Sequence, residues 1–182
     1  MSRCIVVTGP PCAGKSSLAR LLAARYAWPL LAKDDYKERV FRHLGGADRD
    51  WSRRVSLLAW ELLLAEAARL AAAGVDCVLE GNVRAAQRMA LGGLEPRPAF
   101  LEVRLAARPA VLEERYLARA RDGSRHPGHV DLLALPGLAL ELVPPAVAPA
   151  PSLGACIECE TSEGFDWAPL LAPLDAFAGA AP

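Results

Sequence analysis

Residues 9–16 read Gly-Pro-Pro-Cys-Ala-Gly-Lys-Ser, a complete G-x-x-x-x-G-K-S motif, and this motif restricts the fold more than any other feature of the chain. An apolar segment at residues 3–8, rich in β-branched side chains, precedes it and is typical of a buried strand. Residues 17–26 follow with helical periodicity and good helix formers. A strand, a glycine loop and a helix in this order predict a site for nucleoside triphosphate phosphates rather than a chance glycine-rich turn.

The residues of this loop have distinct predicted tasks. Backbone N–H groups and the positive end of the following helix point at the phosphates. We expect Lys15 to reach the β- and γ-phosphates and the Ser16 hydroxyl to ligate Mg²⁺. The predicted nucleotide contacts in this loop are Gly9, Pro10, Pro11, Cys12, Ala13, Gly14, Lys15, Ser16 and Ser17.

The rest of the chain alternates short apolar segments with helical ones. Further strands are predicted at 28–32, 75–79, 98–105 and 155–160, and helices at 34–42, 50–73, 109–121 and 167–177. This alternation predicts an α/β P-loop NTPase fold with three α/β/α layers, a five-stranded parallel sheet and a ligand site at the carboxyl ends of the strands. A length of 182 residues suits one domain.

Two helices carry more specific expectations. In the helix at 50–73, Val55, Leu58, Leu62 and Ala65 are predicted to form the buried stripe. The helix at 167–177 is expected to be interrupted by Pro169 and Pro173. Residues 135–154 are rich in proline and read as a long connection on the surface.

Composition limits the partners and the compartment. Twenty-one basic and 21 acidic residues give zero net charge, so no global field attracts nucleic acid. Five cysteines, no signal sequence and no apolar run near 20 residues favour a reducing cytoplasm. Cys156 and Cys159 form a C-x-x-C without a second pair, so ordinary strand cysteines are preferred to a zinc site. The Cys12 thiol, beside a helix N-terminus, is expected to be modifiable rather than catalytic.

Two adjacent carboxylates follow the second predicted strand. Asp35, with Glu38 three residues later, is predicted to cap the helix as in a capping box. Asp34 has no such duty and is predicted to accept the proton of an attacking hydroxyl. The alternative is that both are solvated acids at the start of a helix.

A third cluster follows the third strand. Glu80 ends that strand beside the P-loop, where it is predicted to support Mg²⁺ directly or through water, or else to be an exposed strand-end acid. Asn82 and Arg84 lie just beyond it, and are predicted either to contact the acceptor or hold Asp34, or to be ordinary loop residues.

A basic helix leads into a polar, glycine-rich segment, and residues 115–131 are predicted to form a lid. Arg115 and Arg119 lie on one helical face and are predicted to stabilise charge on the transferred phosphoryl group. Arg125 is placed with the acceptor contacts, and the two histidines His126 and His129 with the lid or the acceptor. A solvated basic face is the competing interpretation.

The P-loop, the Lys-Asp-Asp-Tyr-Lys segment at 33–37, Glu80-Gly81-Asn82 and the arginine helix together resemble the P-loop kinases of the polynucleotide kinase and chloramphenicol phosphotransferase type. The resemblance implies ATP and Mg²⁺ as co-substrates and in-line transfer to a hydroxyl. It places the general base at Asp34, a substrate contact at Lys37 and the border of the adenine at the loop containing Thr161. That family has arginine where Lys37 stands and aspartate where Glu80 stands, which weakens the case for a polynucleotide substrate.

The leading functional prediction is therefore an ATP-dependent kinase for a hydroxyl of a small molecule, either a metabolite or an antibiotic of nucleoside or phenicol type. A polynucleotide 5′-hydroxyl kinase is the first alternative, since Arg39, Arg42, Arg49, Arg53 and Arg54 form a local basic track. A regulatory ATPase without an acceptor is the second. A monomer or a homodimer is expected, without membrane association.

Overall fold

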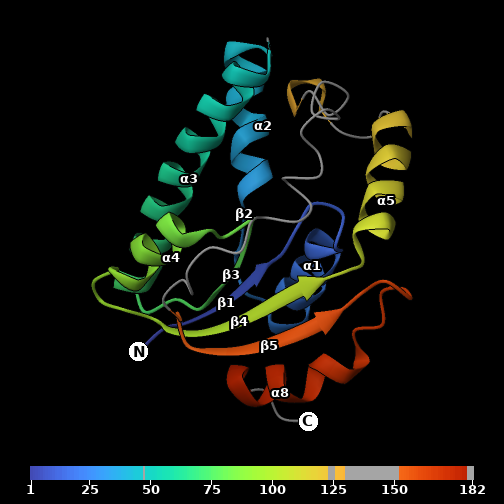
Figure 1. Cartoon of the computed structure of the whole chain (residues 1–182). Helices are drawn as coiled ribbons and strands as arrows, with labels where there is room; N and C mark the ends of the chain where they lie inside the picture. Colours follow the sequence, from blue (N-terminus) through green and yellow to red (C-terminus); the bar gives the residue numbers. More distant parts are fainter. Residues whose placement is uncertain (47, 123–125, 130–151, 180–182) are drawn as a thin grey trace.

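The computed structural model describes residues 1–46, 48–122, 126–129 and 152–179 (Figure 1). Five strands form one sheet in which every pairing is parallel, in the order β2-β3-β1-β4-β5. Their bounds are β1 Arg3–Thr8, β2 Leu30–Ala32, β3 Cys77–Glu80, β4 Ala99–Ala106 and β5 Ala155–Glu160. The predicted α/β fold with a five-stranded parallel sheet is confirmed.

Helices cover both faces of this sheet. Their bounds are α1 Lys15–Tyr26, α2 Lys33–Leu44, α3 Arg49–Ala72, α4 Ala85–Gly92, α5 Pro109–Asp122 and α8 Ala168–Ala178, with a 3₁₀ turn at Pro127–His129. On one face, Val7 of β1 packs with Leu18 of α1 and Leu174 of α8. On the other face, Val6 packs with Leu63 of α3. The alternation along β1 thus feeds two cores, which explains why its whole run is apolar.

The register of the strands brings the polar segments to one edge. Val7 of β1 and Ala32 of β2 both pair with Glu80 of β3, so these three strands end at nearly the same level. The Thr8 hydroxyl accepts a hydrogen bond from the Val83 N–H at 2.9 Å, which ties the loop after β3 to the start of the P-loop. The P-loop, the start of α2 and Glu80 therefore meet at the carboxyl edge of the sheet.

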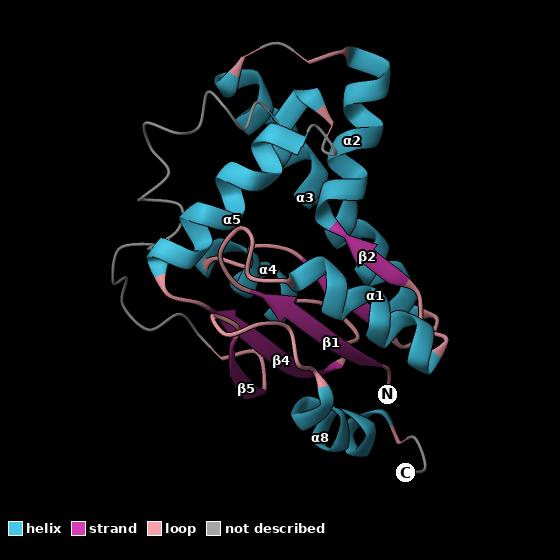
Figure 2. Cartoon of the chain, turned by 90° about the vertical axis from the view of Figure 1, so that its right-hand side faces the viewer, coloured by secondary structure: helices cyan, strands magenta, loops and turns pink. Residues whose placement is uncertain are grey.

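Three helices rise above this edge. In both views α2 and α3 stand side by side, with α5 across from them and α8 at the opposite end of the molecule (Figures 1 and 2). Residues 123–125 and 130–131 of the predicted lid, and residues 135–151 of the predicted proline-rich connection, lie outside the described residues. Leu153, just after them, is buried in the core beside α3 and α4.

Four expectations about helices were wrong. The α4 helix was not predicted, because eight residues carry too short a pattern to show a period. The α3 helix is apolar on two faces, and periodicity chose the wrong one: Leu58, Leu62 and Ala65 are exposed. Its buried apolar residues are Val55, Ala59, Trp60, Leu63, Ala67 and Ala71.

The other two concern proline and capping. The α8 helix is continuous, since Pro169 lies in its first turn and Pro173 is accommodated inside it. The α2 helix begins at Lys33, directly after β2, with Ala32 at the N-cap position and no side-chain capping bond. Asp35 is therefore an exposed residue inside the first turn and does not cap the helix.

Candidate active site

The P-loop backbone requires glycine at two positions. At Gly9, with φ of 146°, a Cβ atom would lie 2.4 Å from the carbonyl oxygen of Leu105 in β4. At Gly14, with φ of 90°, it would lie 2.6 Å from the ring of Phe165. Between them Cys12 adopts a left-handed conformation with φ of 64°, which is strained for a residue with a Cβ. The loop is thus held in its phosphate-binding shape by β4 and by the segment after β5.

Lys15 begins α1 and lies within a group of charged side chains. Its ammonium donates to the Pro10 carbonyl at 2.8 Å, inside the loop. Burial lowers the pKa of Lys15, and the positive charge of Arg119 acts in the same direction, whereas the negative charges of Glu80 and Asp34 oppose the shift. Two cations and two carboxylates therefore share one field at the predicted γ-phosphate position. Ser16 and Ser17 are exposed in the same helical turn, where a hydroxyl can reach a bound ion or phosphate.

Asp34 occupies the first turn of α2. Its carboxylate is partly exposed and lies 3.3 Å from the Lys33 ammonium. The positive end of a helix dipole attracts a carboxylate in the first turn. Asp35 next to it is exposed. Asp34 is thus the acid of this pair whose charge acts on both Lys15 and Glu80.

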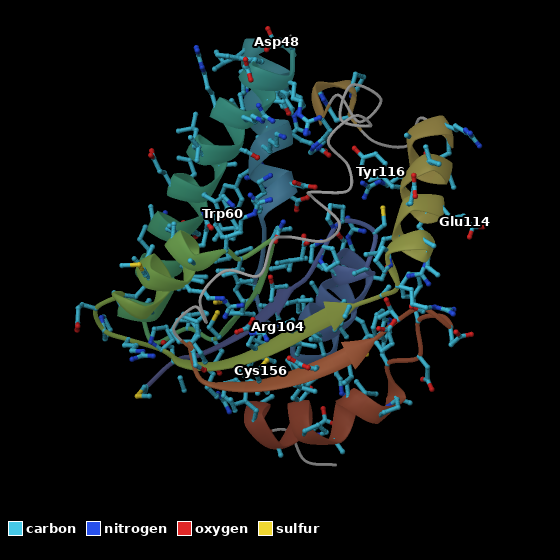
Figure 3. All side chains as sticks on the ribbon, viewed as in Figure 1. Asp48, Trp60, Arg104, Glu114, Tyr116 and Cys156 are labelled. Atoms are coloured by element: carbon cyan, nitrogen blue, oxygen red, sulfur yellow. The ribbon has the colours of Figure 1, made fainter. Side chains whose placement is uncertain are left out.

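Glu80 is a buried carboxylate at the end of β3. Burial raises its pKa and so does Asp34, while Lys15 lowers it. Behind it, the Trp60 indole lies against Gly81, where a Cβ would come within 2.9 Å of the ring. Figure 3 labels Trp60 on α3, the helix that closes this side of the site. Trp60 could not be identified from the sequence, because nothing in the spacing links α3 to the loop after β3.

The acceptor side is formed by α2, α3 and the 3₁₀ turn. Lys37 is buried, and its ammonium donates to the Ser52 hydroxyl at 2.8 Å and lies 5.4 Å from the centroid of the Phe41 ring. Lys37 therefore helps to hold α2 on α3, and its contact with a substrate stays a prediction. His129 is also buried, and its ring pairs with the Glu38 carboxylate at 3.0 Å. Glu38 lies one turn after Asp34 on α2.

The 3₁₀ turn at Pro127–His129 and the residue before it pack on Phe41. The ring of His126 stacks on Phe41 with centroids 5.5 Å apart, and the ring of His129 meets it edge-on at 5.8 Å. Gly128 lies between them, and a Cβ there would come within 2.5 Å of the Phe41 ring. The expectation that both histidines lie with the lid or the acceptor side is consistent with this packing on α2. Arg125 lies outside the described residues.

The two arginines of α5 have different surroundings. Arg119 lies 5.2 Å from the centroid of the Tyr116 ring and shares the electrostatic field of Lys15. Arg115 donates to the Thr161 carbonyl at 2.6 Å and lies 4.5 Å over the Phe165 ring. Arg115 thus faces the loop after β5, while Arg119 is the arginine near the phosphate-binding lysine. Figure 3 labels Tyr116 on α5, and this residue is buried in the core that includes Leu18 of α1.

Thr161 joins that loop to the P-loop. It is buried, and its hydroxyl lies 3.3 Å from the Ala13 carbonyl and 3.0 Å from the Ala106 carbonyl. Phe165 and Trp167 follow and stack on each other with centroids 5.6 Å apart. These two aromatic residues were not singled out in the sequence, although they cover Gly14. The loop expected to border the adenine is therefore adjacent to the P-loop.

Asn82 and Arg84 lie on the stretch between β3 and α4. Asn82 is half-buried, and Arg84 is exposed at the start of α4, where its backbone N–H donates to the Gln87 side chain at 3.2 Å. The neighbouring Arg88 forms a buried ion pair with Glu102 of β4 and fastens α4 to the sheet. Roles for Asn82 and Arg84 toward the acceptor stay predictions.

The donor set fits Mg²⁺ rather than a metal held by protein alone. Among the described residues, no group of three His, Cys, Asp or Glu side chains could hold an ion. The site instead offers a hydroxyl at Ser16 and a carboxylate at Glu80, and Mg²⁺ in nucleotide sites takes few protein ligands besides phosphates and water. In the same part of the chain, no helix is long and apolar enough to cross a membrane.

Comparison with known proteins assigns this arrangement to a family. The family model AAA_33, described as an AAA domain, matches residues 4–136. The chain belongs to this AAA domain family. No curated protein sequence matches the chain.

Solved structures extend the assignment of this AAA domain. A protein from Chloroflexus aurantiacus J-10-fl, provisionally described as a kinase, is 32% identical, with 97% of this chain and 98% of that chain covered and a TM-score of 0.86. A sugar kinase from Janibacter sp. HTCC2649 is 17% identical, with 100% and 97% covered and a TM-score of 0.62. Shikimate kinase from Acinetobacter baumannii is also 17% identical, with 98% and 94% covered and a TM-score of 0.54. The predicted P-loop kinase fold is confirmed, and the matches support an ATP-dependent kinase.

Proposed function

We propose that this chain transfers the γ-phosphoryl group of ATP to a hydroxyl group of a small molecule. The observation that carries the proposal is the charge cluster at the carboxyl edge of the sheet, in which Lys15 is influenced by Arg119, Glu80 and Asp34 together. Phosphoryl transfer requires cations at the phosphate and a base at the nucleophile, and this cluster offers both.

The proposed reaction is a direct displacement. The acceptor oxygen attacks the γ-phosphorus as the bond from that phosphorus to the β,γ-bridging oxygen breaks, and ADP leaves. Asp34 takes the proton of the acceptor hydroxyl, while Lys15 and Arg119 stabilise the charge on the γ-phosphate oxygens. Mg²⁺, held by Ser16 and supported by Glu80, would neutralise charge on the β- and γ-phosphates. Arg115 and Thr161 border the base of the nucleotide in this proposal.

The surroundings of Asp34 favour a small acceptor over a polynucleotide. Next to Asp34, the face of α2 that carries it presents the carboxylate of Glu38, which pairs with His129. The basic track expected for a polynucleotide is partly neutralised, since Arg53 pairs with Asp50 at 3.1 Å. A phosphate backbone would gain little attraction from such a surface.

The proposal is tested by ADP release from Mg²⁺-ATP with a panel of acceptors whose products are identified by mass. The panel contains nucleosides, sugars, antibiotics of the nucleoside, phenicol and aminoglycoside classes, and a 5′-hydroxyl oligonucleotide. We expect one small molecule to gain a single phosphoryl group. Phosphorylation of the oligonucleotide alone, or steady ADP release with no phosphorylated acceptor, would overturn the proposal in favour of a polynucleotide kinase or a regulatory ATPase.

A further inference from the structure

The outer side of the α2–α3 pair carries an apolar groove of about 480 Å³ that the catalytic proposal does not use. Its apolar lining comes from both helices: Tyr36, Val40 and Leu44 from α2, and Leu58, Leu62 and Ala65 from α3. Three of these are large and exposed, with exposed fractions of 62% for Leu44, 39% for Leu58 and 44% for Leu62. Contiguous exposed apolar side chains of this kind mark an interaction surface.

The spacing of this surface is that of a helical bundle. The α2 residues recur at intervals of four, and the α3 residues at four and three, so each helix presents one straight apolar seam. A second seam of α3, about 100° around the helix and including Ala59 and Leu63, is already buried in the core. The α3 helix thus has two apolar faces, and only one of them is covered by the fold.

The charges beside the groove are of both signs. Arg39, Arg69 and Glu66 all line it. Burial raises the pKa of Tyr36 and so does Glu66, whereas Arg39 and Arg69 lower it, so all three charges act on the Tyr36 hydroxyl. Glu66 pairs with Arg69 at 2.8 Å on the same helix. A border of mixed sign does not favour a strongly acidic or basic partner, whereas it matches an identical copy placed about a two-fold axis.

We propose that this groove is a homodimer interface in which the α2–α3 pairs of two copies pack as a four-helix bundle. Leu58 and Leu62 of each copy would be buried against the groove of the other copy. Arg39 of one copy would meet Glu66 of the other. The arrangement is isologous and therefore closes after two copies.

The active site stays accessible in such a dimer. At 100° per residue, Asp34, Glu38 and Phe41 share one face of α2, while Tyr36 and Val40 lie on a different face, turned toward α3 and the groove. The interface therefore holds the helix that carries Asp34 from its outer side without covering the carboxylate. The proposal does not depend on the acceptor or on turnover.

The test is the mass of the protein in solution, measured by sedimentation velocity over a range of concentrations. We expect the wild type to reach twice the chain mass of 19.4 kDa. Leu62→Glu and Leu58→Glu, made separately, should each weaken the dimer by at least about 100-fold, because a symmetric interface loses each leucine twice. Leu57→Glu is the matched control: it lies on the same helix, is 64% exposed and does not line the groove, so it should leave the dimer intact.

Circular dichroism and ATP binding of each variant establish that it is folded, and the use of two separate leucine variants guards against failure of one. A wild type that stays monomeric at every concentration would overturn the proposal, as would a dimer that the two groove variants leave intact or that Leu57→Glu weakens as much as they do. Open-ended association beyond a dimer would also contradict it. Failure of the acceptor panel with a dimer that responds as expected would overturn the catalytic proposal alone.

Discussion

The nucleotide side and the acceptor side of the site are built in different ways. On the nucleotide side, the predicted phosphate contacts come from consecutive residues of one loop, in which glycine is required at Gly9 and Gly14 because β4 and the segment after β5 approach the backbone there. On the acceptor side, α2 is held by contacts from distant parts of the chain, such as the pairing of Glu38 with His129, 91 residues away. A phosphate is the same in every nucleotide, whereas acceptors differ, so side-chain contacts on the acceptor side can change without altering the phosphate site.

Lys15→Ala, which changes the nucleotide side alone, is expected to have the largest combined effect, because it lowers both turnover and ATP affinity. Loss of the ammonium removes both the phosphate contact and the charge that stabilises transfer, so turnover should fall by about 10³-fold and ATP affinity should weaken. ADP release and ATP titration calorimetry measure the two effects. Arg20→Ala, an exposed change on the same helix, is the control and should alter neither. Normal turnover in Lys15→Ala would remove this lysine from the site.

Asp34→Asn is expected to separate the two sides. The amide cannot take a proton, so kcat should fall by about 10²–10⁴-fold while ATP affinity is retained. Asp35→Asn is the matched control, since this neighbour is exposed and caps nothing, and it should leave both kcat and stability nearly unchanged. If Asp35→Asn is the inactive variant, the roles of the two acids are reversed.

Gly128→Ala tests whether the contacts of the 3₁₀ turn position the acceptor side. The added methyl would lie 2.5 Å from Cδ2 of Phe41, so the turn must shift and its pairing with α2 must weaken. We expect a loss of about 1–3 kcal/mol in the free energy of unfolding and a higher KM for the acceptor, with the KM for ATP unchanged. Urea unfolding and steady-state kinetics measure these quantities.

The control for that variant is Gly92→Ala, at the end of α4. A Cβ there meets nothing closer than 4.0 Å, so this variant should be as stable as the wild type or slightly more stable. Equal losses in the two glycine variants would show that the Phe41 contact has no special role. A rise in the KM for ATP alone would contradict the division into two sides.

The smallest expected effect concerns Glu80, which lies between the two sides. Its pKa is raised by burial above the ordinary value of 4.5. Between the ordinary pKa of the unfolded state and the raised pKa of the folded state, the folded protein holds a proton that the unfolded protein has lost. The stability contributed by this group therefore falls as pH rises. Glu80→Gln lacks this loss. Its Tm relative to the wild type should therefore increase from pH 4 toward pH 7, even though its activity decreases.

Glu61→Gln on α3 provides the comparison for the pH series, because it makes the same chemical change at an exposed position. A Tm difference for Glu80→Gln that does not change between pH 4 and pH 7 would mean that burial does not control the pKa of this carboxylate. The measurement is thermal unfolding followed by circular dichroism in a single buffer mixture.

The sequence allowed the sheet and the phosphate loop to be predicted because their signals are local. Residues 3–16 contain the strand, the glycines and Lys15, and no distant contact is needed to interpret them. The role of Asp34 as the base stays a prediction, and the capping argument used for Asp35 was wrong. The helix starts at Lys33, directly after β2 and one residue before the predicted start at residue 34.

The remainder depended on tertiary contacts. The α3 helix has two apolar seams of similar strength, so only packing decides that Leu63 is buried and Leu62 is not. Trp60 against Gly81 and Phe165 against Gly14 each join segments that share no motif. Such pairs leave no trace in the spacing of a single sequence, which is why one wall of the candidate site was missed.

The aromatic stack beside Gly14 gives the loop an optical signal of its own. The Trp167 indole would lie 3.1 Å from a Cβ at Gly14, and the Phe165 ring lies still closer. Indole emission responds to nearby charge and polarity, so a triphosphate arriving at the loop should change the fluorescence of the unlabelled protein. The aromatic side chains that require glycine at position 14 thus also place a fluorescent indole beside the phosphate loop. Nucleotide binding to the loop can therefore be followed in real time.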